Sequence, residues 1–456
     1  MRALSPVDML FLTLEKRQQP MHVGGLFLFR IPQNAPADYV HQLVQDIRNS
    51  RAIPVPPFNQ VLNGMFWDED DEFDIDQHFR HISLPRPGRI RELLIYISQE
   101  HSALIDRAKP LWECHIIEGI EDNRFAMYFK MHHAMVDGIA GMRLLEKSLS
   151  HSPTDKRIVP LWAVKNNKLK KPATNPISKT AKLVGLLSEQ VHTAPTVTRE
   201  VVNAIKELRT NPDYVSAFQA PRSILNQPVS ASRRFAAQSY ALPRLRNVAK
   251  KLGVTINDMV LAICSGAMRS YLLNQRALPK KPLIAMVPIS LRKDDTDSGN
   301  QISMILANLA THKADPMERL AMIRRSVINA KDRFSRMSKT EVINYSGIVY
   351  SVAGLNLMTG VLPKLQAFNL VISNVPGPRE ALYWNGAQLD ALYPVSIVLD
   401  GQAMNITLTS YMDKLEVGII ACRKTLPRIQ SLLNLLEEEI QTFEQLTAHM
   451  PDPEHA

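Results

Sequence analysis

Two neighbouring histidines are the clearest candidates for chemistry in this chain. The stretch from Lys130 to Gly138 reads KMHHAMVDG, and it follows a strand-length apolar and aromatic run, Phe125 to Met131. Apolar residues then recur at helical spacing from Ile139 to Leu149. The sequence therefore predicts that His132 and His133 lie where a strand ends and a turn leads into a helix.

The two imidazoles are expected to have different roles. Successive side chains of a strand point to opposite faces, so one ring should face the packed interior and the other an open side. This suits a single general base, because imidazole titrates near neutral pH. Asp137 could hold an imidazole tautomer, and Gly138 would permit backbone angles or a close helix approach that a larger residue obstructs. No third ligand is nearby in the sequence, so we expect no metal site.

Further motifs accompany the histidines along the chain. They are, in order, Pro110, Leu111 and Trp112; Asn257 and Asp258; and Ser373 to Pro378. With the pattern His-His-x-x-x-Asp-Gly, they resemble the bacterial wax ester synthase/diacylglycerol acyltransferase branch of the CoA-dependent acyltransferase superfamily. That superfamily also includes chloramphenicol acetyltransferase and the condensation domains of peptide synthetases. The resemblance extends over nearly the whole chain, from Leu4 to Cys422.

The resemblance implies an α/β (α+β) fold of two chloramphenicol-acetyltransferase-like lobes with a tunnel at their interface. A chain of 456 residues is also too long for one ordinary core. We expect an N-terminal lobe at 1–150 that carries the histidines, a linker with helical pieces at 151–229, and a C-terminal lobe at 230–456. The lysine-rich linker and its amphipathic stretch, Ile177 to Val191, could contact a membrane or could be a plain tether.

Hydrophobic periodicity predicts individual elements as well. Expected strands, besides the one before the histidines, are Val23 to Phe29, Glu113 to Glu118, Leu283 to Val287, Met304 to Leu309, Phe368 to Ser373, Met404 to Tyr411 and Leu415 to Ala421. Expected helices are one carrying Val40 to Ile47, Ile90 to about Asp106, Leu242 to Lys251, Met259 to Leu273, one from near Met317, and a last one carrying Ile429 to Phe443.

The resemblance also implies a mechanism. His133 would be the general base that removes the proton from a fatty alcohol or a diacylglycerol hydroxyl. The alcohol oxygen would attack the thioester of a long-chain acyl-CoA directly, without a covalent acyl-enzyme. His132 would pack or orient the site, and Asp137 would pair with an arginine and fix the turn. Acyl-CoA is then a substrate, and no cofactor is expected.

The other motif residues are expected to support the site. We favour a core aromatic role for Trp112 beside Pro110 and Leu111, and a helix-capping role for Asn257 and Asp258. Candidate hydrogen-bond donors near the thioester, or turn-stabilising residues, are Asn374 and, as weaker candidates, Asn405 and Ser410. The small residues of Thr340 to Leu362 are a candidate tunnel wall or a plainly buried helix.

Charge and composition limit the partners. The net charge of +10 fits phosphate-bearing acyl-CoA, an anionic lipid surface or simple solubility. No nucleic-acid-binding motif occurs, so we expect no nucleic acid partner. Without a membrane-spanning run or a signal peptide, the chain is expected to be cytoplasmic, with peripheral contact with the inner membrane or lipid inclusions. Cys114, Cys264 and Cys422 are too scattered for a disulfide framework or a zinc cluster.

Among acceptors, fatty alcohol is favoured over diacylglycerol. Two alternatives stay open at this level. One is a condensation-type acyltransferase whose acyl group arrives on a carrier protein. The other is an inactive protein that binds lipid droplets.

Overall fold

The computed structural model describes residues 2–50, 52–136, 138–165, 219–290, 302–336 and 366–451. Helices and strands are mixed in this part of the chain, which confirms the predicted α/β class. The chain divides into two compact units: Met1–Lys168 with Ile224–Gly253 and Val371–Ala456, and Leu169–Ser223 with Val254–Leu370. Asp137, the amphipathic stretch Ile177 to Val191 and the candidate tunnel wall Thr340 to Leu362 lie outside the described residues.

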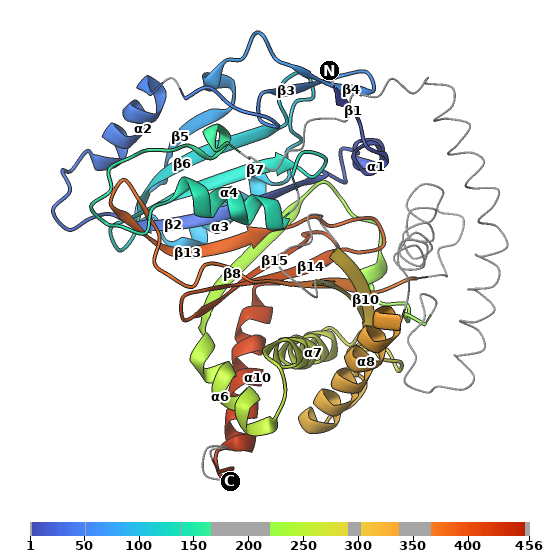
Figure 1. Cartoon of the computed structure of the whole chain (residues 1–456). Coiled ribbons are helices and arrows are strands. Elements are labelled where there is room, and N and C mark those ends of the chain that lie inside the picture. Colours follow the sequence, from blue (N-terminus) through green and yellow to red (C-terminus); the bar gives the residue numbers. More distant parts are fainter. Residues whose placement is uncertain are drawn as a thin grey trace. The chain divides into compact units, whose positions relative to one another are not determined.

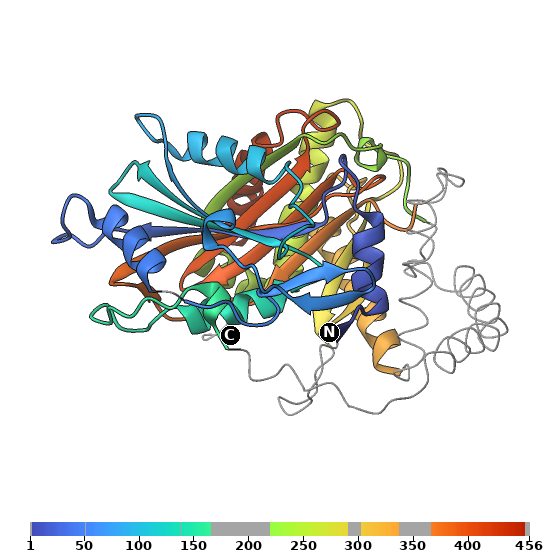
Figure 2. The same ribbon diagram turned by 90° about the horizontal axis from the view of Figure 1, so that it is seen from above.

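The sheet that carries the histidines belongs to the first unit. Its strands, in the order β12-β13-β2-β7-β6-β5, are β12 (Tyr383–Trp384), β13 (Ala387–Val395), β2 (His22–Arg30), β7 (Arg124–His132), β6 (Trp112–Ile120) and β5 (Phe79–Ser83). β7 pairs antiparallel with both β2 and β6, whereas β5 runs parallel to β6. The orange strand β13 lies beside the blue strand β2 in Figure 2, so a late segment of the sequence completes an early sheet.

Alternation along these strands gives the sheet two apolar faces. One face, which includes Phe29, Trp112 and Phe129, is covered by α2 (Tyr39–Asn49) and α4 (Gly138–Ser148). The opposite face, which includes Leu26 and Tyr128, is covered by α3 (Ile90–Glu100) and by strands β8 and β15. Because both faces are buried, the strands of this sheet contain long runs of apolar residues.

The first unit contains a second set of strands. Their order is β11 (Leu370–Val375), β14 (Met404–Tyr411), β15 (Lys414–Cys422) and β8 (Arg233–Ala241). β11 is parallel to β14, and the other two pairings are antiparallel. Helix α6 (Leu242–Leu252) ends at Gly253, whose φ of 61° is a left-handed C-cap. It packs beside α10 (Ser431–Thr447), as Figure 1 shows.

The second unit contains the antiparallel pair β9 (Ile284–Ser290) and β10 (Ile302–Asn308). Two long helices, α7 (Ile256–Asn274) and α8 (Pro316–Arg336), pack against each other. α7 begins with a capping box, in which the side chains of Thr255 and Asp258 bond to each other's backbone N–H. The predicted helix-capping role of Asp258 is therefore confirmed.

A small sheet and the first helix lie next to the histidine motif. The sheet has the order β1 (Arg2–Ala3), β4 (Phe66–Glu69) and β3 (Gln60–Asn63), and α1 (Pro6–Leu14) lies beside it in Figure 1. Short 3-10 turns occur at Ile75–Gln77, Leu161–Ala163 and Ile224–Asn226. A buried cluster joins these parts: Leu12, Trp67, Ile105, Leu111 and Ala134. This cluster holds α1 against the segment that follows His133.

The predicted elements that fall within the described residues are present, with ends shifted by a few residues. The predicted helix from Ile90 stops at Glu100 rather than near Asp106. The sequence did not indicate β8 or β13, and the division at 150 and 230 did not anticipate that β13 would join the N-terminal sheet. Among the described residues no single helix could cross a membrane, although the bent pair α6 and α7 together meets the requirements of length and composition.

Candidate active site

The two histidines differ in exposure, as strand alternation predicts. His132 is the last residue of β7 and is 1% exposed. His133 follows in a turn and is partly exposed. The two rings therefore have different surroundings, and only His133 of the pair is within reach of solvent.

The ring of His132 is held in one tautomer. Its Nδ1 accepts a hydrogen bond from the backbone N–H of Ala134 at 3.1 Å, so Nδ1 carries no proton. The proton of the neutral ring must then be on Nε2, which lies 3.4 Å from Oε2 of Glu15. A ring that is 1% exposed, with Nδ1 accepting from the backbone and Nε2 next to a carboxylate, is poorly placed to take a proton from a substrate.

Glu15 is the C-cap residue of α1, and its side chain is 4% exposed. Oε1 accepts from Nε of Arg107 at 3.0 Å, and Oε2 accepts from the N–H of Met21 at 3.1 Å. Burial alone would raise the pKa of Glu15, but the His132 ring, the Met21 N–H and Arg107 together lower it below the ordinary value. Glu15 is therefore a buried carboxylate that stays ionised at neutral pH.

The ring of His133 lies against α1. It stacks on Phe11 with 4.2 Å between ring centroids and 17° between the planes. The backbone N–H of His133 donates to the carbonyl of Met21 at 2.8 Å. Both the ring and the backbone of His133 are thus positioned by the segment formed by α1 and the loop that follows it.

The upstream motif supports the end of β7 from the other side. Pro110, Leu111 and Trp112 are buried, and the Leu111 carbonyl accepts from the His132 N–H at 2.9 Å. Trp112 stacks on Phe129 with centroids 5.6 Å apart, and its Nε1–H donates to the Phe58 carbonyl at 2.8 Å. These contacts fit the core role predicted for Trp112.

Gly138 does not have the property predicted for it. It is the exposed first residue of α4 and is not in the left-handed region. A Cβ built there would meet no atom of the described structure within 4 Å, apart from its chain neighbours and its own helix. Within the described residues, neither a left-handed backbone nor a close helix approach is seen at Gly138.

The later motif forms a tight turn. Gly377 donates its N–H to Oγ of Ser410 at 3.2 Å, and a Cβ at Gly377 would lie 2.2 Å from the Ser410 carbonyl oxygen. This turn therefore requires glycine. Asn374 is partly exposed in β11. Asn405 is 5% exposed, and its Oδ1 accepts from Thr407 at 2.8 Å. Asn257 and Asp258 belong to the second compact unit.

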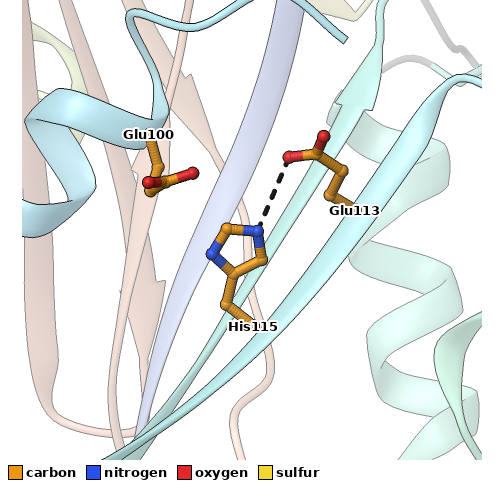
Figure 3. Close-up of side chains that lie close together, drawn as sticks. All are labelled: Glu100, Glu113 and His115. Atoms are coloured by element: carbon orange, nitrogen blue, oxygen red, sulfur yellow. Dashed lines mark ion pairs between the residues drawn. The ribbon is translucent and has the colours of Figure 1, made fainter. Parts of the chain in front are cut away.

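A group of charged residues lies along β6 and β7. In Figure 3, Glu113 and His115 of β6 and Glu100 of α3 point toward one another, close enough together to hold a metal ion. Protein cations already face these acids, because Lys130 Nζ is 3.0 Å from Glu113 and Arg80 is 3.5 Å from Glu100 and 3.6 Å from Glu113. We interpret the group as a charge network rather than a metal centre.

The pKa values of this network follow from its geometry. Burial would raise the pKa of Glu113, but His115, Lys130 and Arg80 lower it to about 2. Burial lowers the pKa of Lys130 more than Glu113 raises it. The Lys130 ammonium also donates to the carbonyls of Glu100 and Ala103, which ties the C-terminal end of α3 to β7.

Comparison with known proteins identifies the family. The model of the wax ester synthase/diacylglycerol acyltransferase catalytic domain matches residues 4–260, and the model of the C-terminal domain of the same family matches residues 298–444. The chain belongs to the wax ester synthase/diacylglycerol acyltransferase family. It is therefore an acyltransferase, as the motifs predicted.

Individual relatives of this family span the whole chain. "O-acyltransferase WSD" of Acinetobacter baylyi is 66% identical over 99% of both chains. A probable diacylglycerol O-acyltransferase of Mycobacterium tuberculosis is 40% identical over 98% of this chain and 99% of its own. The solved wax ester synthase/diacylglycerol acyltransferase of Marinobacter aquaeolei has 44% identity and a TM-score of 0.81, covering 98% of this chain and 100% of that one.

A more distant structure shares the fold alone. The first condensation domain of the CDA synthetase is 14% identical with a TM-score of 0.56, and it covers 99% of this chain and 97% of its own. This likeness agrees with the predicted relation to the superfamily at the level of architecture.

Several residues next to the histidines in this acyltransferase were not found from the sequence. They are Phe11, Glu15, Met21 and Arg107. The resemblance begins at Leu4, just before α1, but carries no indication that Glu15 would meet His132. All three cysteines are buried, and burial raises the pKa of the Cys114 thiol.

Proposed function

We propose that this chain transfers a long fatty acyl group from acyl-CoA to a fatty alcohol, which gives a wax ester, with diacylglycerol as the second acceptor. The names of its relatives in Acinetobacter, Mycobacterium and Marinobacter support the reaction class. One observation supports the choice of base: both nitrogens of His132 face protein groups, whereas His133 is partly exposed. The carrier-dependent alternative has no separate support, because likeness to condensation domains extends only to the fold.

The proposed reaction needs no covalent enzyme intermediate. His133 removes the proton of the hydroxyl as its oxygen forms a bond to the thioester carbonyl carbon. The tetrahedral intermediate then collapses, the carbon–sulfur bond breaks, and the imidazolium returns the proton to the leaving CoA thiolate. The products are the ester and free CoA, and His133 is neutral again.

Other residues keep the roles proposed for them by resemblance. Asp137 would fix the turn after the histidines, and Asn374 would donate a hydrogen bond near the thioester, with Asn405 and Ser410 as weaker candidates. Stacking on Phe11 supports a defined orientation of the His133 ring. We further propose two lobes with the reaction in a tunnel between them, and peripheral association with the inner membrane or lipid inclusions. The water-insoluble acceptors and the net charge of +10 support that association.

Substitution of His133 tests the proposed base. His133→Gln keeps a polar side chain but cannot act as a base, and we expect it to lower thiol release from acyl-CoA in the presence of fatty alcohol by about 10²- to 10⁴-fold. Asp390→Asn is a matched control, because Asp390 pairs with Arg30, Arg124 and Lys414 and not with a histidine. Offering one acyl-CoA a fatty alcohol and a diacylglycerol together, with product analysis, measures the acceptor preference. Wild-type turnover by His133→Gln would refute the base role.

A further inference from the structure

Glu15 joins two parts of the site that are far apart in sequence. Its Oε1 accepts from Arg107 Nε at 3.0 Å, and its Oε2 faces both the Met21 N–H at 3.1 Å and His132 Nε2 at 3.4 Å. With a side-chain exposure of 4%, the carboxylate is enclosed by these groups. Glu15 is thus a buried acid next to His132, and it comes from the end of α1, far from the histidines in the sequence.

The Glu15 carboxylate lies beside His132. The Ala134 N–H occupies Nδ1 of His132, so the proton of the neutral ring is on Nε2, which is 3.4 Å from the carboxylate and has no hydrogen-bond partner among the described residues. A second ionisable side chain, His22, lies opposite His132 in the β2–β7 ladder. It donates to the His101 carbonyl at 2.9 Å. Burial lowers the pKa of His22, so that neighbour is neutral. Glu15 is therefore the charged neighbour of His132 in this comparison, and His22 is a neutral one.

The same acid also anchors His133. Met21 donates its N–H to Glu15 and accepts the N–H of His133 on its carbonyl, so a single residue links the carboxylate to the backbone of the second histidine. Gln19 fixes the loop between them, because it donates to the Leu14 carbonyl at 2.9 Å and accepts from the Asp400 N–H at 2.8 Å. Glu15 therefore acts on both members of the histidine pair.

We propose that Glu15 is a positioning residue of the acyl transfer: its carboxylate holds His132 as the Nε2–H tautomer and fixes the backbone of His133 through Met21. This inference rests on the proposed role of His133 as the base. In this arrangement the acid that orients the histidines comes from the end of α1.

Glu15→Gln is the direct test, because the amide keeps the size of the side chain and removes its charge. We expect kcat to fall about 10- to 100-fold while KM for acyl-CoA and for the alcohol changes by less than about threefold, since the Glu15 carboxylate is enclosed by protein groups. The loss should be smaller than the roughly 10⁴-fold effect of holding a base itself in the wrong tautomer. Asp390→Asn, which removes another ion-paired carboxylate, should keep kcat within about twofold.

A measurement on the wild-type protein keeps the proposal falsifiable if Glu15→Gln does not fold. In the neutral His132 ring, the nitrogen NMR signals, assigned by their loss in His132→Asn, should show a protonated Nε2 and an unprotonated Nδ1. A proton on Nδ1 of the neutral ring would overturn the proposal. So would a Glu15→Gln variant with wild-type kcat, or one that raises KM alone.

Failure of the proposed function gives a different result. If His133→Gln retains wild-type turnover, the base role is lost whatever Glu15→Gln does. If His133→Gln is inactive and Glu15→Gln is fully active, only the positioning role of Glu15 is refuted.

Discussion

Glu416 provides a quantitative test of how this fold treats a buried acid. It lies on β15 opposite Ser239 of β8 and Thr409 of β14, and it is fully buried. Ser239 donates to its Oε2, while its Oε1 has no hydrogen-bond partner among the described residues. Burial raises the pKa of Glu416 to about 7, against the lowering effects of Ser239 and Lys414.

The sign of the pH effect follows from this shift. The native carboxyl keeps its proton up to about pH 7, whereas the unfolded one releases it near its ordinary value of 4.5. The contribution of the protonated Glu416 side chain to the free energy of unfolding is therefore complete below about pH 4.5 and is lost as the pH rises through about 7. A shift of this size corresponds to about 3 kcal/mol.

Glu416→Gln removes the titration without changing the shape of the side chain. Its amide oxygen can accept from Ser239, and its NH₂ can donate to Thr409 Oγ1, which is buried and lacks a partner among the described residues. The free energy of unfolding, measured with urea at pH 5 and pH 8, should exceed that of the wild type by about 3 kcal/mol at pH 8 and by much less at pH 5.

Glu113→Gln is the matched control for this experiment. Because the pKa of Glu113 is lowered to about 2, its stabilising effect is present above about pH 4.5 and is lost only as the pH falls toward 2. This variant should lose stability by the same amount at pH 5 and pH 8. Equal gains of Glu416→Gln at both pH values, or a loss at pH 8, would refute the reasoning.

The remaining predictions concern two glycines and the lipid surface. Gly138→Ala should keep the melting temperature or raise it, because Ala favours a helix over Gly by about 1 kcal/mol and its Cβ would meet no described atom within 4 Å. Turnover should fall if substrates approach beside His133, as proposed. Full activity of Gly138→Ala would show that substrates do not pass beside Gly138. Gly377→Ala should instead reduce the free energy of unfolding by about 1–3 kcal/mol and so lower the melting temperature, because its Cβ would lie 2.2 Å from the Ser410 carbonyl oxygen. In flotation assays the wild type should bind anionic vesicles at low salt and release them at high salt, and equal absence from anionic and neutral vesicles would contradict the proposed association.

The sequence by itself determined the local features of the site. The run before His132 forms β7, the residues after Gly138 form α4, and Thr255 with Asp258 caps α7. These outcomes depend on alternation, helical periodicity and capping, which act between residues a few positions apart. The two histidines differ in exposure as predicted, although His133 lies in the turn after β7 and not in the strand itself.

Only the tertiary structure decided what surrounds those elements. Glu15 meets His132 because α1 packs against the segment after β7, and β13 joins β2 because strand register is set by the whole sheet. Gly138 was predicted to allow special backbone angles or a close helix approach, and neither is seen among the described residues. Contacts between residues distant in sequence depend on how elements pack, and the spacing of residues along the chain carries no record of that packing.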